Sequence, residues 1–226
     1  MKDTSVLIYS CDKYSDVWGI FFKLFFKYWD CLYQVYLATE SEQCLIPEVK
    51  TITTGDGTWT ERIHYAVSEI PTKYVIGMCE DMFFRRKVDQ ITINNCLITM
   101  EEDDNIACFN FEKEYDWVEH ANVFGFDKKP QGSQYCKTCQ PTLWRRDILA
   151  ELLDTKQSAW EWEMSSSPDC YDYYIWTGDE RDMVFEYGYH NHEWFGIQKG
   201  KWVAHDVMPL FEKEGIEIDY SIRGIV

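Results

Sequence analysis

The segment Tyr74-Val-Ile-Gly-Met-Cys-Glu80-Asp81-Met-Phe-Phe places two acidic residues directly after an apolar run. The run opens with the β-forming residues Tyr74, Val75 and Ile76, which indicates a buried strand. Ligands of α/β sheets bind at the carboxyl ends of the strands, so we expect Glu80 and Asp81 at the mouth of a site. Adjacent carboxylates repel each other unless a shared proton or a cation relieves them, and a divalent metal that bridges to phosphate oxygens is one such relief. The alternative is a solvated strand end with two unrelated acids.

Strand and helix patterns alternate on both sides of this segment. The expected strands are Ser5–Tyr9, Tyr33–Ala38, Val49–Thr53, the run from Tyr74 and Ile106–Phe111, and the expected helices are Tyr14–Trp29, 59–70, 89–100, Thr142–Leu153 and Val207–Glu214. Thr58 and Glu61 form a capping box for the second helix, and Pro71 ends it. Residues 112–132 are expected to form a loop or hairpin, and a second hairpin is expected around Gly196 and Gly200. This order predicts an α/β fold with a mainly parallel sheet covered by helices on both faces, followed by an irregular C-terminal part.

Composition limits the classes of function. The 226 residues fit one large domain or two small ones, and no shift in composition demands a boundary, so we expect a single domain over 1–226. Aromatic residues make up 17%, which suits sugar or base stacking as well as a core. The net charge of −17 disfavours nonspecific nucleic-acid binding and attraction of the whole surface to anionic lipid.

Cysteine usage and hydropathy indicate a cytoplasmic protein. The nine cysteines are odd in number and scattered through apolar segments, which favours a reducing compartment. No signal peptide is visible, and no stretch reaches the length of a membrane span. The most apolar window, Val17–Trp29, carries Lys23 and Lys27 one helical turn apart, so it is interpreted as a mostly buried helix with one polar stripe. Peripheral membrane contact through this helix is the alternative.

Two further motifs have both a chemical and a structural interpretation. No glycine-rich phosphate loop is present, so a nucleotide would need another anchor, for which Cys11 and Asp12 at the end of the first strand are candidates; Asp12 could equally be a helix-start residue. Cys136-Lys-Thr-Cys139 is a single CxxC without a second ligand pair at zinc-finger spacing, so metal or redox chemistry is the minority interpretation.

The segment Ser158-Ala-Trp160-Glu161-Trp162-Glu163 places two carboxylates among indoles. Burial beside apolar rings raises the pKa of a glutamate and makes it a usable base at neutral pH, whereas the structural alternative is a surface helix turn anchored by Trp160. On a helix, residues 160 and 163 share a face and 161 points elsewhere, so Glu161 and Glu163 are not expected to do the same job. We favour Glu161 slightly, because the paired indoles could exclude water around it. His190, His192 and His205 are further candidates for metal ligands, although a lone histidine is more often structural.

Several segments, in the same order along most of the chain, resemble bacterial glycosyltransferases of surface-polysaccharide gene clusters. They are Ser10-Cys-Asp-Lys-Tyr-Ser-Asp-Val-Trp18, Phe21-Phe-Lys-Leu-Phe25, Lys27-Tyr-Trp-Asp30, Lys73-Tyr-Val-Ile76, Glu80-Asp-Met-Phe-Phe84, Gln140-Pro-Thr-Leu-Trp144-Arg-Arg146 and Trp160-Glu-Trp-Glu163. The resemblance implies a GT-A fold with a Rossmann-like nucleotide-sugar-binding half, about 1–111, and an acceptor-binding half, about 112–226. It also implies transfer of a sugar from a nucleotide-sugar, and the expected acceptor is a hydroxyl of a saccharide or lipid-linked saccharide.

The resemblance assigns roles to individual residues. Glu80 and Asp81 match the acidic motif that holds Mn²⁺ or Mg²⁺ on the donor diphosphate, although the family's motif is often Asp-x-Asp or Asp-Asp, and here the first acid is Glu and position 82 is Met. Cys11 and Asp12 match the strand end that lines the nucleotide pocket. Glu161 or Glu163 falls on the acceptor side, where a carboxylate would deprotonate the acceptor hydroxyl of an inverting enzyme. Further positive charge for the diphosphate is expected from arginines. The candidates are Arg85, Arg86 and Arg145.

Two other classes of function remain open from the sequence. A glycoside hydrolase also uses paired carboxylates and aromatic platforms, but it needs no nucleotide. A non-catalytic sugar- or nucleotide-binding module would bind without turnover and would tolerate loss of Asp81 and Glu161 without a chemical effect. Nucleotide binding separates the transferase from the hydrolase, and turnover separates it from the binding module.

Overall fold

The computed structural model describes residues 3–113, 118–188 and 196–226. Its strands are β1 (Thr4–Tyr9), β2 (Gln34–Thr39), β3 (Val49–Thr53), β4 (Tyr74–Cys79), β5 (Ile106–Lys113), β6 (Glu119–Val123), β7 (Phe126–Lys128), β8 (Thr142–Arg145), β9 (Asp172–Trp176), β10 (Ile197–Gln198) and β11 (Lys201–Trp202). Its helices are α1 (Ser15–Tyr28), α2 (Trp59–Ser68), α3 (Gln90–Glu102), α4 (Arg146–Leu153), α5 (Ala159–Met164) and α6 (Ala204–Glu214), with 3₁₀ turns η1 (Asp12–Tyr14) and η2 (Glu180–Asp182).

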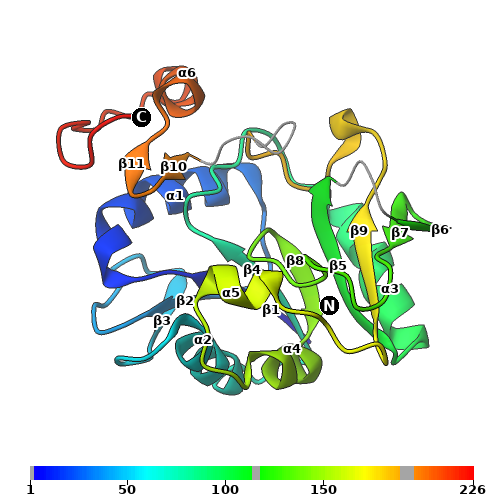
Figure 1. Cartoon of the computed structure of the whole chain (residues 1–226). Coiled ribbons are helices and arrows are strands. Elements are labelled where there is room, and N and C mark those ends of the chain that lie inside the picture. Colours follow the sequence, from blue (N-terminus) through cyan, green and yellow to red (C-terminus); the bar gives the residue numbers. More distant parts are fainter. Residues whose placement is uncertain (1–2, 114–117, 189–195) are drawn as a thin grey trace.

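Within the described residues, one large sheet has the strand order β3-β2-β1-β4-β8-β5-β9-β7-β6, and β10 pairs with β11 separately (Figure 1). The first four strands of this order are mutually parallel, as in a Rossmann-like half-sheet. Beyond β4 the sheet is mixed, because β8 runs antiparallel to both of its neighbours while β5 and β9 are parallel. The expected α/β fold is confirmed, with its parallel part concentrated in the first half of the chain.

The sheet has a core on each face because successive residues of a strand point to opposite sides. In β1, Val6 and Ile8 belong to the cluster under α1, α3 and α6, whereas Leu7 and Tyr9 belong to the cluster under α2, α4 and α5. In Figure 1, α1 lies above the sheet and α2 and α4 lie below it. Gly77 of β4 is required here, since a Cβ at this position would lie 1.8 Å from the hydroxyl oxygen of Tyr9 on the neighbouring strand.

The region predicted as one helix, Thr142–Leu153, was predicted wrongly at its start. Its first four residues are β8, and the helix α4 begins only at Arg146. Leu143 and Trp144 are fully buried on opposite faces of the sheet, which is the alternation of a strand. Strand and helix join without a turn residue, so no local pattern marks the boundary; pairing with β4 and β5 decides it.

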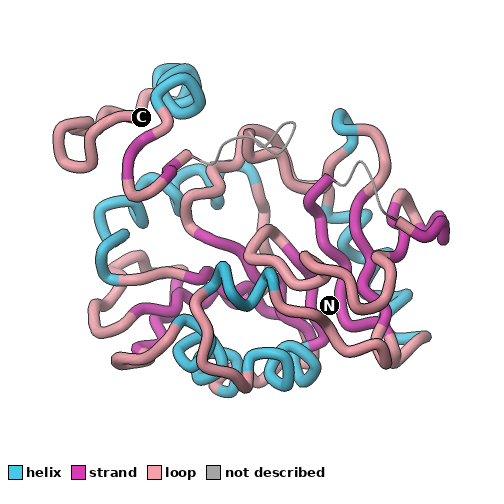
Figure 2. Tube along the Cα trace, viewed as in Figure 1, coloured by secondary structure: helices cyan, strands magenta, loops and turns pink. Residues whose placement is uncertain are grey.

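Other local predictions agree with the structure. Thr58 and Glu61 form the expected capping box at the start of α2. The two expected hairpins are present as β6–β7 and β10–β11, and Figure 2 shows long loops between the strands of the second half. β9 lies in the segment expected to be irregular, because its residues are aromatic without a clear alternation; its pairing with β5 and β7 stabilises it as a strand.

The polar stripe of α1 contacts the end of α6. Lys27 forms an ion pair with Glu214, and Lys23 Nζ donates to the carbonyl oxygens of Glu214 and Gly215 at 3.4 and 3.3 Å. Cations are favoured at a helix C-terminus because its carbonyl groups carry partial negative charge. The two lysines therefore help to fasten α6 and the chain after it onto α1. None of the described helices has the length and hydropathy needed to cross a membrane.

Candidate functional site

The acidic pair lies at the carboxyl end of β4, beside the end of β1. Tyr9 and Cys79 are register partners in these parallel strands, so the residues that follow them, Ser10 and Glu80, are neighbours. Ser10 Oγ donates to Glu80 Oε1 at 2.7 Å, and Trp18 Nε1 of α1 donates to Ser10 Oγ at 2.7 Å. Glu80 is thereby buried at the strand end with one oxygen occupied.

Asp81 lines a cavity of about 1090 Å³ at the carboxyl ends of these strands. Several parts of the chain form its wall, including β5 with Lys113, β9 with Ile175 and the β10–β11 hairpin with Lys199. The wall also includes η1 with Tyr14, the residues after β4 with Asp81, the β7–β8 loop with Tyr135 and Cys139, and α5 with Trp160 and Glu163. Strand-end clefts of this kind are the usual ligand sites of α/β folds.

Burial makes both carboxylates difficult to ionise. It raises the pKa of Glu80 to about 8, with a smaller contribution from the negative charge of Asp81, and it raises the pKa of Asp81 to about 7. The guanidinium of Arg223 opposes both shifts. Arg223 comes from the C-terminal tail and is fixed by an ion pair with Asp16 and by a 2.7 Å bond to the carbonyl oxygen of Lys13. Sequence reasoning missed this residue, because 142 positions separate it from Asp81.

The carboxylate oxygens at the end of β4 are suitable ligands for a hard cation that takes few ligands from the protein. Mg²⁺ and Mn²⁺ prefer oxygen ligands, and such ions are commonly held by one or two carboxylates with phosphate oxygens and water completing the shell. Asp81 lines the cavity, whereas the adjacent Glu80 is buried and does not line it. Among the described residues, no group of three or more His, Cys, Asp or Glu side chains forms a ready-made metal site. His205 lies in α6, and His190 and His192 lie outside the described residues.

Asp12 is hydrogen-bonded to the turn after β2. Its carboxylate accepts hydrogen bonds from the backbone N–H groups of Glu40, Ser41 and Glu42 and from the Ser41 hydroxyl at 2.7 Å. Burial alone would raise the pKa of Asp12, but these bonds outweigh it and lower the pKa. Glu40 in turn pairs with Arg62 at 2.7 Å. Asp12 therefore joins the ends of β1 and β2, and its oxygens are occupied by the chain itself.

Cys11 is half-buried near the acidic pair. Burial raises the pKa of its thiol, and the charges of Glu80 and Glu40 raise it further. All nine cysteines are free thiols, including both members of the CxxC motif. Cys139 of that motif lines the cavity and contacts Cys79 from β4, whereas Cys136 lies against Cys108 of β5. The two motif cysteines thus have separate partners.

The two glutamates of α5 occupy different environments. Glu161 is exposed, and its Oε2 accepts from the backbone N–H and the hydroxyl of Ser158 at 2.8 Å each, which is a capping box at the helix start. Glu163 lines the cavity, and its Oε1 accepts from the Cys139 N–H at 2.6 Å and from the Thr138 hydroxyl at 3.1 Å. Hydrogen bonds lower the pKa of Glu161, while burial raises that of Glu163. Helical spacing alone separates the two residues; only the structure shows which of them reaches the cavity.

The three arginines that were expected to place positive charge near the diphosphate have partners outside the cavity. Arg85 pairs with Asp206, and Arg86 donates to the carbonyl oxygen of Met183 at 2.8 Å. Arg145 donates to the carbonyl oxygens of Met100 and Asp103 at 2.6 and 2.9 Å. None of these three side chains is among the residues that line the cavity in the described part of the chain.

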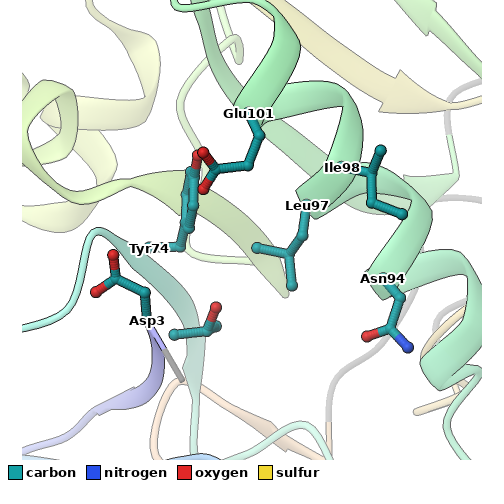
Figure 3. Close-up of a pocket in the computed structure, with 7 residues that line it drawn as sticks. Asp3, Tyr74, Asn94, Leu97, Ile98 and Glu101 are labelled. Carbon is teal, nitrogen blue, oxygen red and sulfur yellow. The ribbon is translucent and has the colours of Figure 1, made fainter. Parts of the chain in front are cut away.

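A second, smaller cavity of about 330 Å³ lies at the amino ends of the strands, between β1, β4 and helix α3 (Figure 3). Its lining residues are Asp3, Thr4, Tyr74, Asn94, Leu97, Ile98 and Glu101. Both acids are held by Lys73: Asp3 Oδ1 accepts from its backbone N–H at 2.9 Å, and Glu101 pairs with its ammonium at 3.0 Å. This cavity is separate from the strand-end site and shares no lining residue with it.

No protein-family model matches the chain, and no curated protein matches its sequence. Among solved structures, the chain is similar to the bifunctional IspDF of Campylobacter jejuni, with a TM-score of 0.47 and 12% identity over 82% of this chain and 52% of that one. It is also similar to the mannosyltransferase PcManGT of Pyrobaculum calidifontis in complex with GDP-Man and Mn²⁺, with a TM-score of 0.47 and 10% identity over 80% and 58%. S. aureus TarS 1-349 follows, with a TM-score of 0.42 and 11% identity over 78% and 60%. This chain therefore spans between about half and three-fifths of each of these proteins.

Proposed function

We propose that this protein is a glycosyltransferase that moves a sugar from a nucleotide-sugar to a hydroxyl of a saccharide acceptor. The observation that carries the proposal is that one cavity of about 1090 Å³ joins Asp81, at the end of β4, to Glu163, on α5. A donor diphosphate needs positive charge beside a strand end, and an acceptor hydroxyl needs a base. A cavity with a hard-cation ligand at one wall and a buried carboxylate at another meets both needs.

The donor side of the mechanism rests on Asp81. Its carboxylate would hold Mn²⁺ or Mg²⁺, with the buried Glu80 adjacent to it, and the ion would neutralise charge on the leaving nucleoside diphosphate. Because both carboxyl groups have raised pKa values, a cation that binds there displaces protons, and its affinity rises with pH. Ser10 keeps Glu80 in place through its 2.7 Å bond.

The acceptor side rests on Glu163. The bonds from Cys139 and Thr138 orient its carboxylate, and its raised pKa makes it a stronger base than an exposed glutamate. In an inverting transfer it would take the proton of the acceptor hydroxyl as that oxygen attacks the anomeric carbon. A role in surface-polysaccharide assembly, with a lipid-linked saccharide as acceptor, belongs to the same proposal and rests on the sequence resemblance.

A glycoside hydrolase is the second candidate, because Asp81 and Glu163 are two carboxylates in one cavity. A thermal-shift screen of nucleoside diphosphates and nucleotide-sugars, with and without Mn²⁺, separates the two functions. For the transferase we expect one base class to raise Tm by about 5–10 °C at a concentration near 100 times its Kd. Asp81→Asn should lose the Mn²⁺-dependent part of this shift, whereas Glu161→Gln, a matched carboxylate outside the cavity, should keep it. A chain that no nucleotide stabilises, but that hydrolyses aryl glycosides, would be a hydrolase.

A further inference from the structure

Two aromatic side chains line the cavity close to Glu163, and both are exposed. Trp160 is 64% exposed and Tyr135 is 39% exposed. Their ring centroids lie 6.3 Å apart with the planes at 70°, so the rings form a corner. Trp162, two positions along the same helix, is fully buried and packs on Trp59 and Trp144. Trp162 therefore anchors α5 to the core, and Trp160 is not needed for that packing.

Hydrogen bonds join the β7–β8 loop, which carries Tyr135, to the end of α5. The Tyr135 N–H donates to the carbonyl oxygen of Glu163 at 3.1 Å, and Lys137 Nζ donates to Ser165 Oγ at 2.7 Å. Tyr135 also has φ +57°, a left-handed conformation that is costly for a residue with a side chain. Backbone strain of this kind persists only where surrounding contacts enforce it, and the bonds to α5 are such contacts.

We propose that Trp160 and Tyr135 form the acceptor subsite and that its occupant is a saccharide ring stacked on the indole. This inference rests on the proposed function and names the ligand class and the residues of its acceptor side. The apolar C–H face of a pyranose stacks on an indole, and a second ring set at an angle covers its edge. Glu163 is three residues after Trp160 on α5, its backbone carbonyl accepts from the Tyr135 N–H, and all three residues line the same cavity, so a sugar stacked on the rings would lie in the cavity that holds the proposed base.

Saturation-transfer NMR tests this inference without a known acceptor. The probes are methyl glucoside, methyl galactoside, methyl mannoside, N-acetylglucosamine and rhamnose, each with the protein and with the nucleoside diphosphate that stabilises it most. We expect the C–H protons of at least one probe to receive magnetisation from the wild type. Trp160→Ala should weaken that signal by at least about fivefold, which corresponds to the roughly 1 kcal/mol of an aromatic contact. Trp160→Phe should retain part of it.

The matched control is Tyr65→Ala, which removes an aromatic side chain that is 47% exposed on α2 and does not line the cavity. It should leave the signal unchanged. Tyr135→Ala is the second variant, and it should weaken the same protons if Trp160→Ala does not fold. A signal that persists in folded Trp160→Ala and Tyr135→Ala overturns the inference, as does the absence of any saccharide signal from a protein that a nucleotide stabilises. Loss of nucleotide binding in Trp160→Ala overturns it too, because the indole would then serve the donor. Failure of every nucleotide to stabilise the wild type instead removes the proposed function.

Discussion

Ser10 Oγ donates a 2.7 Å hydrogen bond to Glu80 Oε1, across two parallel strands whose residues are 70 positions apart in the chain. The same oxygen of Ser10 accepts from the indole N–H of Trp18. A short chain of donors thus runs from α1 through the end of β1 to the end of β4. It holds one of the two adjacent acids inside the protein, while the other, Asp81, lines the cavity.

Ser10→Ala should destabilise the protein by about 1–3 kcal/mol, because it removes the hydroxyl that donates to the buried Glu80 carboxyl group and accepts from the Trp18 N–H. Urea unfolding at neutral pH measures the change. Ser68→Ala is the control: its hydroxyl bonds to the Tyr65 carbonyl oxygen on the exposed surface of α2, and we expect a change below about 0.5 kcal/mol. Equal changes in the free energy of unfolding for the two substitutions would show that the bond to Glu80 contributes no more to stability than an exposed hydrogen bond does.

Glu163→Gln should lower kcat for transfer by at least about tenfold with little change in nucleotide affinity, since a general base contributes about 10²–10⁴-fold. Glu161→Gln should leave kcat unchanged and should keep the helix cap, because glutamine also accepts a hydrogen bond at the third position of a capping box. Transfer and donor-hydrolysis assays on both variants decide. Wild-type kcat in folded Glu163→Gln would move the base to another residue.

The pH profile of transfer gives a second measurement on Glu163. The base must be ionised to accept a proton, and burial raises its pKa, so kcat should rise with pH through a value above the ordinary glutamate value of about 4.3. Glu163→Gln should remove this acid limb. A limb that stays in the variant belongs to a different group.

Asp127 should make stability depend on pH at the acid end. Burial alone would raise its pKa, but the N–H groups of Asn122 and Ala121 and the hydroxyl of Thr177 outweigh it and lower the pKa to about 2. A carboxyl group with a depressed pKa stabilises the fold above its unfolded value of about 3.9, and the contribution is lost as pH falls through 2. Asp127→Asn should therefore cost about 2 kcal/mol at pH 7, and the cost should shrink towards zero near pH 2.

Chemical denaturation of Asp127→Asn at pH 7 and pH 3 measures this difference. The control is Asp56→Asn, an exposed turn residue, which should follow the wild type at both pH values. A cost for Asp127→Asn that is the same at both pH values would mean that the lost interaction is not that of an ionised carboxylate.

The fragment 1–111 should not fold alone, although it carries the proposed nucleotide-sugar half. β5 pairs with β8 and β9, both from the second half of the chain, and β8 lies between β4 and β5. Without residues 112–226, β5 would lose both of its described partners and the helices would leave apolar faces uncovered. Circular dichroism during heating should show no cooperative transition for the fragment and a single one for the full chain. A cooperative transition in the fragment would instead define it as a separate domain.

Local patterns in the sequence predicted much of the secondary structure in the first half of the chain. The capping box of Thr58 and Glu61, the strand that ends directly before Glu80 and the alternation of elements all depend on residues close together in the sequence, so they can be predicted without knowing the fold. The substrate expectations came from the resemblance, and the metal expectation came from the adjacent acids together with the resemblance; both remain proposals. The boundary at Arg146 could not be predicted, because no turn residue separates β8 from α4.

The sequence by itself determined that two acids follow a buried strand and that two glutamates lie among indoles on a short helix. Only the tertiary structure decided which member of each pair reaches the cavity. Glu80 is held by Ser10 and Glu161 caps α5, whereas Asp81 and Glu163 line one cavity. The physical reason is that hydrogen-bond partners and burial depend on strand register and on loops that bring distant residues together, and neither is encoded in the spacing of neighbours.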